Sequence, residues 1–250
     1  MSQMAVTPSV ADRGVKTSVS STNALLACGV VAAPLFIGVV ALQLLIVDGF
    51  DLRRHPISLL SVGDIGWIQI ANFVVSGVLV IGFATGVRRL LHPGRAGTWG
   101  PLLIGLFGLG LVAGGVFVPD PSLGFPPGTP EGIPDNPSWH ATAHGFAPTI
   151  GINAAVVACF VFVRRFAGLR QWGWAAYCAA TGVAIPLIVM WPTTIDAHGV
   201  PEGIGVRLAA GAALAFIWAA SIAAKLMSGL GMTARPASTG TSPVPTAGPA

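Results

Sequence analysis

Two histidines four residues apart, His140 and His144, have the spacing in this chain that most directly permits chemistry. On a helix such residues lie about one turn apart on the same face, so both imidazoles can point the same way. Two imidazoles bind zinc once a third and fourth ligand complete the site, and Asp120 is the first candidate for the third. Further suppliers are acids and histidines elsewhere in the chain, namely His55, Asp64, Asp196 and His198. The alternative is that both histidines are hydrogen-bonded polar groups near a membrane surface.

Ser58, Asp64, Asp120 and His140 are the candidate catalytic residues. A metal-activated water beside Ser58 or Asp64 would hydrolyse a lipid ester or amide. Without metal, Ser58 would be the nucleophile, His140 the base and Asp120 the orienting acid. The structural alternative is that Ser58 and Ser61 cap a helix, since they have the spacing of two serines before a helix.

A polar stripe enters an apolar segment at Gln69, Asn72 and Ser76. These residues fall on one helix face, and unpaired polar groups are expensive in hydrocarbon, so the stripe should face other helices. Together with Ser61 it predicts a polar pocket formed by Ser61, Gln69 and Asn72. Arg207 lies about one turn inside another apolar segment, where an unpaired charge is costly. In a structural role, it pairs with Glu202 or reaches out to the lipid headgroups. In a functional role, it holds a lipid phosphate.

The composition indicates which class of protein carries these residues. The 250-residue chain is 53% hydrophobic and 9% charged, with a mean hydropathy of +0.76, whereas soluble domains are about one quarter charged. This predicts an integral membrane protein, and the net charge of +4 is therefore no sign of nucleic-acid binding. Cysteines 28, 159 and 178 lie in apolar segments and indicate packing rather than disulfides.

Six apolar segments are long enough to cross a bilayer as helices. They cover residues 24–47, 66–87, 99–118, 139–163, 172–191 and 203–227. The third contains Gly105, Gly108, Gly110, Gly114 and Gly115, which let another helix approach closely. The fold class is therefore all-α, a bundle of six transmembrane helices over residues 24–227. A disordered leader, 1–23, and a disordered Pro, Thr, Ser and Gly tail, 228–250, are expected to flank it.

The charges predict an orientation. All Lys and Arg residues except Arg53, Arg54 and Arg207 fall on the side of the two termini. By the positive-inside rule both termini are cytoplasmic, and we expect a multi-pass protein of the plasma (inner) membrane. The connector of residues 119–138, rich in proline, cannot form a helix and should lie as an extended lid over the opposite end.

Four features together resemble the domain of unknown function 998 family of bacterial and archaeal membrane proteins. They are the run HPISLLSVGDIGWIQIANFVVSG, a glycine-rich third span ending in GGVFVPDP, a histidine opening the fourth span, and Arg207-Leu208 in the sixth. The resemblance covers about residues 24–227 and implies a six-span helical architecture without an assigned activity. It marks as positions of interest Ser58, Ser61, Trp67, Gln69, Asn72, Asp120, His140 and Arg207.

From these residues we expect a membrane protein whose partners are membrane lipids. The protein would bind a lipid or an unidentified protein partner through a polar pocket at the end away from the termini. The alternative is a metal-dependent membrane hydrolase with zinc held by His140, His144 and Asp120. Metal analysis and lipid retention would separate these two functions.

Overall fold

The computed structural model describes residues 10–233 of the chain, and their side chains from 19 to 230. The elements in chain order are α1 (Val10–Ile46), the short η1 (Ile57–Ser61), α2 (Trp67–Leu91), α3 (Arg95–Val116), α4 (Trp139–Gly168), α5 (Trp172–Val189) and α6 (Ile204–Thr233). Each long helix includes a segment that is long and apolar enough to cross a membrane. The predicted all-α bundle of six transmembrane helices is therefore confirmed.

Several helices extend beyond the predicted spans because a helix can continue past hydrocarbon into water, whereas α3 and α5 end two residues before the predicted ends, at Val116 and Val189. α2 runs to Leu91, through Arg88 and Arg89, where the predicted span stopped at residue 87. The helices α1 and α6 reach into the expected leader and tail, beginning at Val10 and ending at Thr233. The rest of those two segments, residues 1–9 and 234–250, lies outside the described residues.

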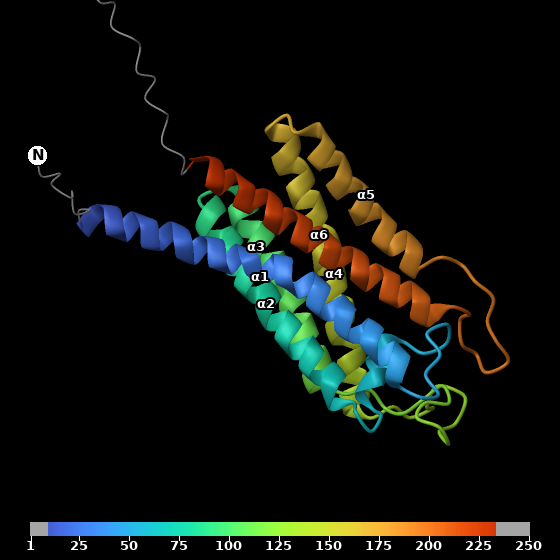
Figure 1. The fold of residues 1–250 in the computed structure, drawn as a ribbon. Helices are drawn as coiled ribbons and strands as arrows, with labels where there is room; N and C mark the ends of the chain where they lie inside the picture. The colour runs from blue at the N-terminus through green and yellow to red at the C-terminus, as the bar shows by residue number, and fades with distance from the viewer. Residues whose placement is uncertain (1–9, 234–250) are drawn as a thin grey trace, which may run out of the picture.

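The six helices form a closed ring, in which each packs on its neighbours in sequence and α6 packs against α1 (Figure 1). One continuous core fills the ring and includes the fully buried Phe83, Phe162, Phe216 and Trp218. The helices alternate in direction, so the connections gather at two ends. We call the end with loops 47–66, 117–138 and 190–203 the lid end, and the end with the α2–α3 and α4–α5 turns the basic end.

Glycines of α3 allow it to pack closely against both of its neighbours. A Cβ on Gly110 would lie 2.6 Å from the carbonyl oxygen of Ala147 in α4, and one on Gly108 would lie 2.8 Å from that of Gly77 in α2. Such distances leave no room for any side chain. The glycine-rich segment predicts that other helices approach it closely, and α3 is approached closely on two faces, by α2 and by α4.

A second, smaller core lies at the lid end. Leu59 of η1, Leu123 and Phe125 of the 117–138 loop and Val200 pack together there and are almost completely buried. The loop is thus held by apolar packing, and Arg54 pairs with Glu131 at 2.7 Å at its edge. The proline-rich connector is an ordered part of the lid end.

Candidate functional site

His144 is a buried side chain that satisfies backbone carbonyl groups at the end of α3. Its Nδ1 lies 3.0 Å from the carbonyl oxygen of Gly114 and 2.6 Å from that of Phe117. The last carbonyls of a helix have no partner within the helix, and a donor from outside must supply one. Nδ1 therefore carries the hydrogen, which leaves Nε2 of the neutral ring as an acceptor.

His140 and Asp120 have other partners. The His140 side chain is exposed, and its ring lies 3.6 Å, centroid to centroid, from that of Trp139. Both carboxylate oxygens of Asp120 accept hydrogen bonds from Ser138, one from the hydroxyl and one from the backbone N–H, each 2.7 Å long. These bonds, with the side-chain one foremost, lower the pKa of Asp120 and tie the start of the 117–138 loop to the start of α4.

The proposed metal ligands are not gathered into a site. Within the described residues, no group of three or more His, Cys, Asp or Glu side chains could hold a metal ion. The two nitrogens of His55 are occupied, since Nδ1 accepts from the Asp51 backbone N–H at 2.9 Å and Nε2 lies 3.0 Å from the Leu123 carbonyl oxygen. Asp196 accepts from backbone N–H groups of its own loop, mainly that of Val200, and its pKa is lowered as a result.

The remaining catalytic candidates are also apart. Ser58 lies on η1 and lines a cavity, whereas Asp64 is an exposed residue of the loop before α2. His140 does not line that cavity, and its ring contacts are with Trp139 and Phe117. The geometry therefore supplies no support for the hydrolase alternative in either form.

The polar stripe of α2 forms an amide network with α1. The Nε2 of Gln43 donates to Oε1 of Gln69 at 2.8 Å, and Nδ2 of Asn72 donates to the same oxygen and to the carbonyl oxygen of Phe36, both at 3.2 Å. Ser76 donates to Asn72 at 3.4 Å. Hence Gln69 and Asn72 join helices, as their position on one face predicts.

Two polar atoms of this network, Oε1 of Gln43 and Nε2 of Gln69, are buried and have no hydrogen-bond partner, and the same is true of Oγ of Ser61 on η1. Ser61, Gln69 and Asn72, the predicted polar pocket, are therefore all buried, but none of them lines the cavity described next.

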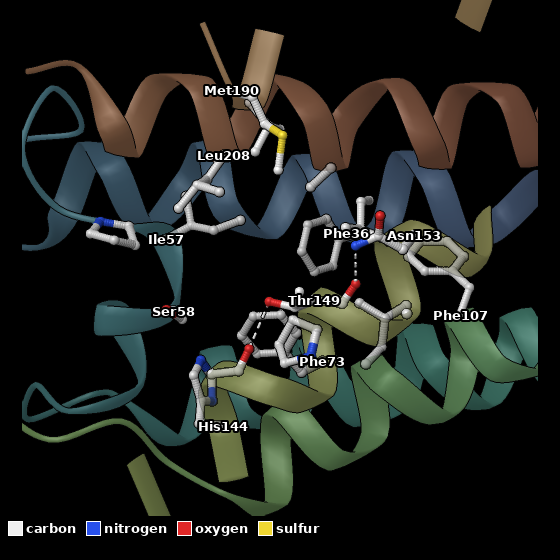
Figure 2. A pocket seen from close by; sticks show the side chains of 18 residues that line it. Phe36, Ile57, Ser58, Phe73, Phe107, His144, Thr149, Asn153, Met190 and Leu208 are labelled. Atoms are coloured by element: carbon white, nitrogen blue, oxygen red, sulfur yellow. Dashed lines mark hydrogen bonds between the residues drawn. The ribbon is translucent and has the colours of Figure 1, made fainter. Parts of the chain in front are cut away.

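A cavity of about 420 Å³ lies inside the ring near the lid end (Figure 2). Its wall is mostly apolar, with the rings of Phe36, Phe73 and Phe107 from three different helices. Pockets for small ligands have volumes of about 300–1,000 Å³ and mostly apolar walls with a few polar groups. The cavity near the lid end matches such pockets in its volume and in its mostly apolar wall.

Four polar side chains line the cavity: Ser58 of η1, and His144, Thr149 and Asn153 of α4. The last two are exposed although they lie in a membrane-spanning segment. Each uses a donor within the helix, since Thr149 bonds the Gly145 carbonyl oxygen at 2.7 Å and Asn153 bonds that of Thr149 at 2.8 Å (Figure 2). The amide oxygen of Asn153 keeps its acceptor capacity for a ligand.

The exposed lining residues show where the cavity opens. Gly145, Thr149 and Asn153 form one stripe of α4, and Met190, at the end of α5, is 79% exposed. Since α4 makes only slight contact with α6, the opening lies where α4 faces the ends of α5 and α6. It opens sideways, toward the surroundings of the bundle.

Sequence reasoning missed Thr149, Asn153 and Gln43. The first two are four positions apart, with Gly145 four positions earlier, and this spacing was a signal for one polar face in an otherwise apolar span. Gln43 gave no comparable pattern, because it is a single amide near the end of its segment.

Arg207 bonds to backbone carbonyl groups at the lid end. Its guanidinium donates to the carbonyl oxygen of Trp191 and, at 3.2 Å, to that of Glu202. The acid expected as its partner thus contributes its backbone oxygen, while the Glu202 carboxylate accepts from the hydroxyl of Thr194. Arg207 joins α6 to the end of α5, beside the cavity wall formed by Leu208.

The fold and this site define a multi-pass integral membrane protein with a ligand-sized cavity inside its helix ring. The sequence matches the family described as Protein of unknown function (DUF998) over residues 30–225, so the chain belongs to that family. The predicted family membership is therefore confirmed. No curated protein and no solved structure matches the chain.

Proposed function

We propose that this protein binds a membrane lipid by taking one hydrocarbon chain into the cavity near the lid end. The observation that carries the proposal is the sideways opening at α4, bordered by Gly145, Thr149 and Asn153. A polar amide is costly where a helix faces hydrocarbon. A ligand that offers a polar group to the Asn153 amide explains why this amide is exposed at the opening.

The cavity wall favours a lipid over a water-soluble ligand. The rings of Phe36, Phe73 and Phe107 offer no hydrogen-bond partner to a polar molecule, and they contribute instead through apolar contact. Polar groups are confined to Ser58 and to the α4 face. A hydroxyl, ester or amide of the lipid would bond there, with Nε2 of His144 as an acceptor.

Replacing Gly145 by leucine tests this proposal. A Cβ at Gly145 meets no atom within 4 Å, so a side chain fits there and projects at the cavity opening without displacing the fold. The probe is a phosphatidylethanolamine with a photoreactive diazirine in its acyl chain. We expect Gly145→Leu to reduce cross-linking to the cavity peptides by about tenfold or more, the effect of losing roughly 1.4 kcal/mol of binding.

Gly38→Leu in α1 is the matched control, because Gly38 is exposed, has no atom within 4 Å of a built Cβ and does not line the cavity. This variant should cross-link like the wild type. Equal labelling of the wild type and Gly145→Leu would contradict the proposal.

The orientation belongs to the same proposal. The lid end faces the outside of the cell and the basic end the cytoplasm, in the plasma (inner) membrane. The support is the distribution of charge, since the described Lys and Arg side chains other than Arg53, Arg54 and Arg207 all belong to the basic end. A lipid would accordingly enter from the outer leaflet.

A cysteine placed at Asn136 tests the orientation. Asn136 is exposed in the 117–138 loop, whereas the native Cys159 and Cys178 are buried and Cys28 is half-buried within the membrane-spanning part of α1. We expect an impermeant maleimide to label Asn136→Cys on intact cells. A cysteine at Arg170, exposed in the α4–α5 turn, should react only after lysis, and the reverse pattern would invert the assignment.

A further inference from the structure

A groove at the basic end lies between α5 and α6, far from the cavity. It has a volume of about 320 Å³ and is lined by Gly173, Trp174, Tyr177 and Ser221. The hydroxyl of Tyr177 donates to that of Ser221 at 3.2 Å. Since the Ser221 oxygen is the acceptor, its own hydrogen is free to be donated to a ligand in the groove.

Lys225 places a positive charge at this groove. It follows Ser221 by four residues on α6 and so lies on the same helix face. Its Nζ is 5.7 Å from the centre of the Trp174 ring, and that ring meets Tyr177 edge-on at 5.8 Å. The ammonium group of Lys225 thus lies over the ring of Trp174, one of the residues that line the groove.

At the basic end, no carboxylate is available to Lys225 among the described side chains. Among the side chains of residues 19–230, all Asp and Glu lie at the lid end, where the pair Arg54–Glu131 is also found. The groove belongs instead to a surface rich in cations, namely Arg88, Arg89, Arg95, Arg164, Arg165, Arg170 and Lys225. This charge is complementary to an anionic ligand.

The surroundings of the groove indicate where that ligand comes from. Trp172 is 66% exposed at the start of α5, which is the position of interfacial tryptophans at the headgroup level. A Cβ on Gly173 would meet no atom within 4 Å, so the groove is open beside this residue. A molecule in the groove would have its polar part at the membrane surface and its apolar part along α5 and α6.

We propose that this groove is a binding site for the phosphate group of an anionic phospholipid in the leaflet at the basic end. Lys225 pairs with the phosphate, and the hydroxyl of Ser221, oriented by Tyr177, donates to a phosphate oxygen. The acyl chains remain in the bilayer against the two helices. This site is independent of the cavity, so either proposal can fail without the other.

Competition between two lipids tests the site. Purified full-length protein is incubated with mixed micelles of equimolar phosphatidylglycerol and phosphatidylcholine with identical acyl chains, and the lipid retained after washing is quantified by mass spectrometry. We expect the wild type to retain phosphatidylglycerol preferentially. Lys225→Gln should reduce that preference about fivefold, the effect of one basic side chain near an anionic surface.

Two further variants separate a built groove from general surface charge. Gly173→Leu leaves every charge in place and narrows the groove, so it should also lower phosphatidylglycerol retention. Arg95→Gln removes an exposed cation of the same end at the start of α3, outside the groove, and should leave the preference unchanged.

Three results would overturn the site. The first is an equal loss of the phosphatidylglycerol preference in Arg95→Gln and Lys225→Gln. The second is unchanged phosphatidylglycerol retention in Gly173→Leu, and the third is displacement of phosphatidylglycerol by excess inorganic phosphate. Unchanged melting temperatures of the three variants serve as the check that each of them is folded.

Discussion

His144 illustrates how a residue with catalytic chemistry serves as a structural donor. Its Nδ1 bonds carbonyl oxygens of Gly114 and Phe117, where α3 ends, and the same ring lines the cavity. His140, one turn earlier, is exposed and packs with a tilted ring against Trp139. The two imidazoles share a helix face, yet one is a buried hydrogen-bond donor and the other a surface side chain.

Substitution of the two histidines should therefore give unequal results. His144→Leu leaves two carbonyl oxygens without their donor, which costs about 1–3 kcal/mol. Its melting temperature in detergent should fall clearly below that of the wild type. His140→Leu should change stability by no more than about 0.5 kcal/mol, as is usual for surface positions. Equal destabilisation by both substitutions would speak for a shared role such as joint metal binding.

At the scale of the helices, α3 is the element on which its two neighbours, α2 and α4, pack closely. Gly110 faces α4 near Ala147 and Gly151, and Gly108 and Gly115 face α2. Close backbone approach replaces the hydrophobic driving force that helices lack inside a lipid bilayer. This packing also sets the position of α4, which carries Thr149 and Asn153 to the cavity opening.

Gly110→Ala should disturb this arrangement, and Gly105→Ala should not. The added methyl at Gly110 would be 2.6 Å from the Ala147 carbonyl oxygen, whereas at Gly105 the nearest atom is 3.9 Å away, an ordinary contact. Overpacking costs about 1–3 kcal/mol. Thermal unfolding should show a lower melting temperature for Gly110→Ala alone, and a neutral result there would contradict the tight packing of α3 on α4.

The whole molecule has two cores of different kinds. The larger one fills the helix ring, and the smaller one, with Leu59, Leu123, Phe125 and Val200, holds three loops together at the lid end. His55 adds a polar link by bonding the carbonyl oxygen of Leu123. Within residues 19–230 the charges are divided in the same way, with the acids at the lid end and most cations at the other.

Because the two cores consist of different buried residues and share only the partly buried Val47 and Phe50 as neighbours, Phe125→Ala should open the lid end without unfolding the ring. Loss of a fully buried phenylalanine costs about 3–5 kcal/mol, and here the cost falls on loop 117–138. Limited proteolysis should cut this loop faster, while the helical circular dichroism remains that of the wild type. Pro127→Ala, at an exposed position of the same loop, is the control. Loss of helix content in Phe125→Ala would show that the two cores are coupled.

The sequence alone determined the class of the protein, its six helices and its separation of charge. Long apolar runs and the placement of Lys and Arg depend on the chain's own periodicity and on the bilayer, so they can be deduced residue by residue. The same holds for the close packing at the glycines of α3 and for the polar face of Gln69 and Asn72.

Only the tertiary structure decided which polar groups meet. Asp120 accepts a hydrogen bond from Ser138, and His55 bonds the carbonyl oxygen of Leu123, which is 68 residues away in the sequence. These contacts form because the loops fold over one another at the lid end. The cavity required parts of all six long helices and η1 to converge, with Ser58 in its wall and Ser61 outside it. No local pattern specifies such contacts, since they follow from how helices pack across the ring and not from the order of residues within one helix.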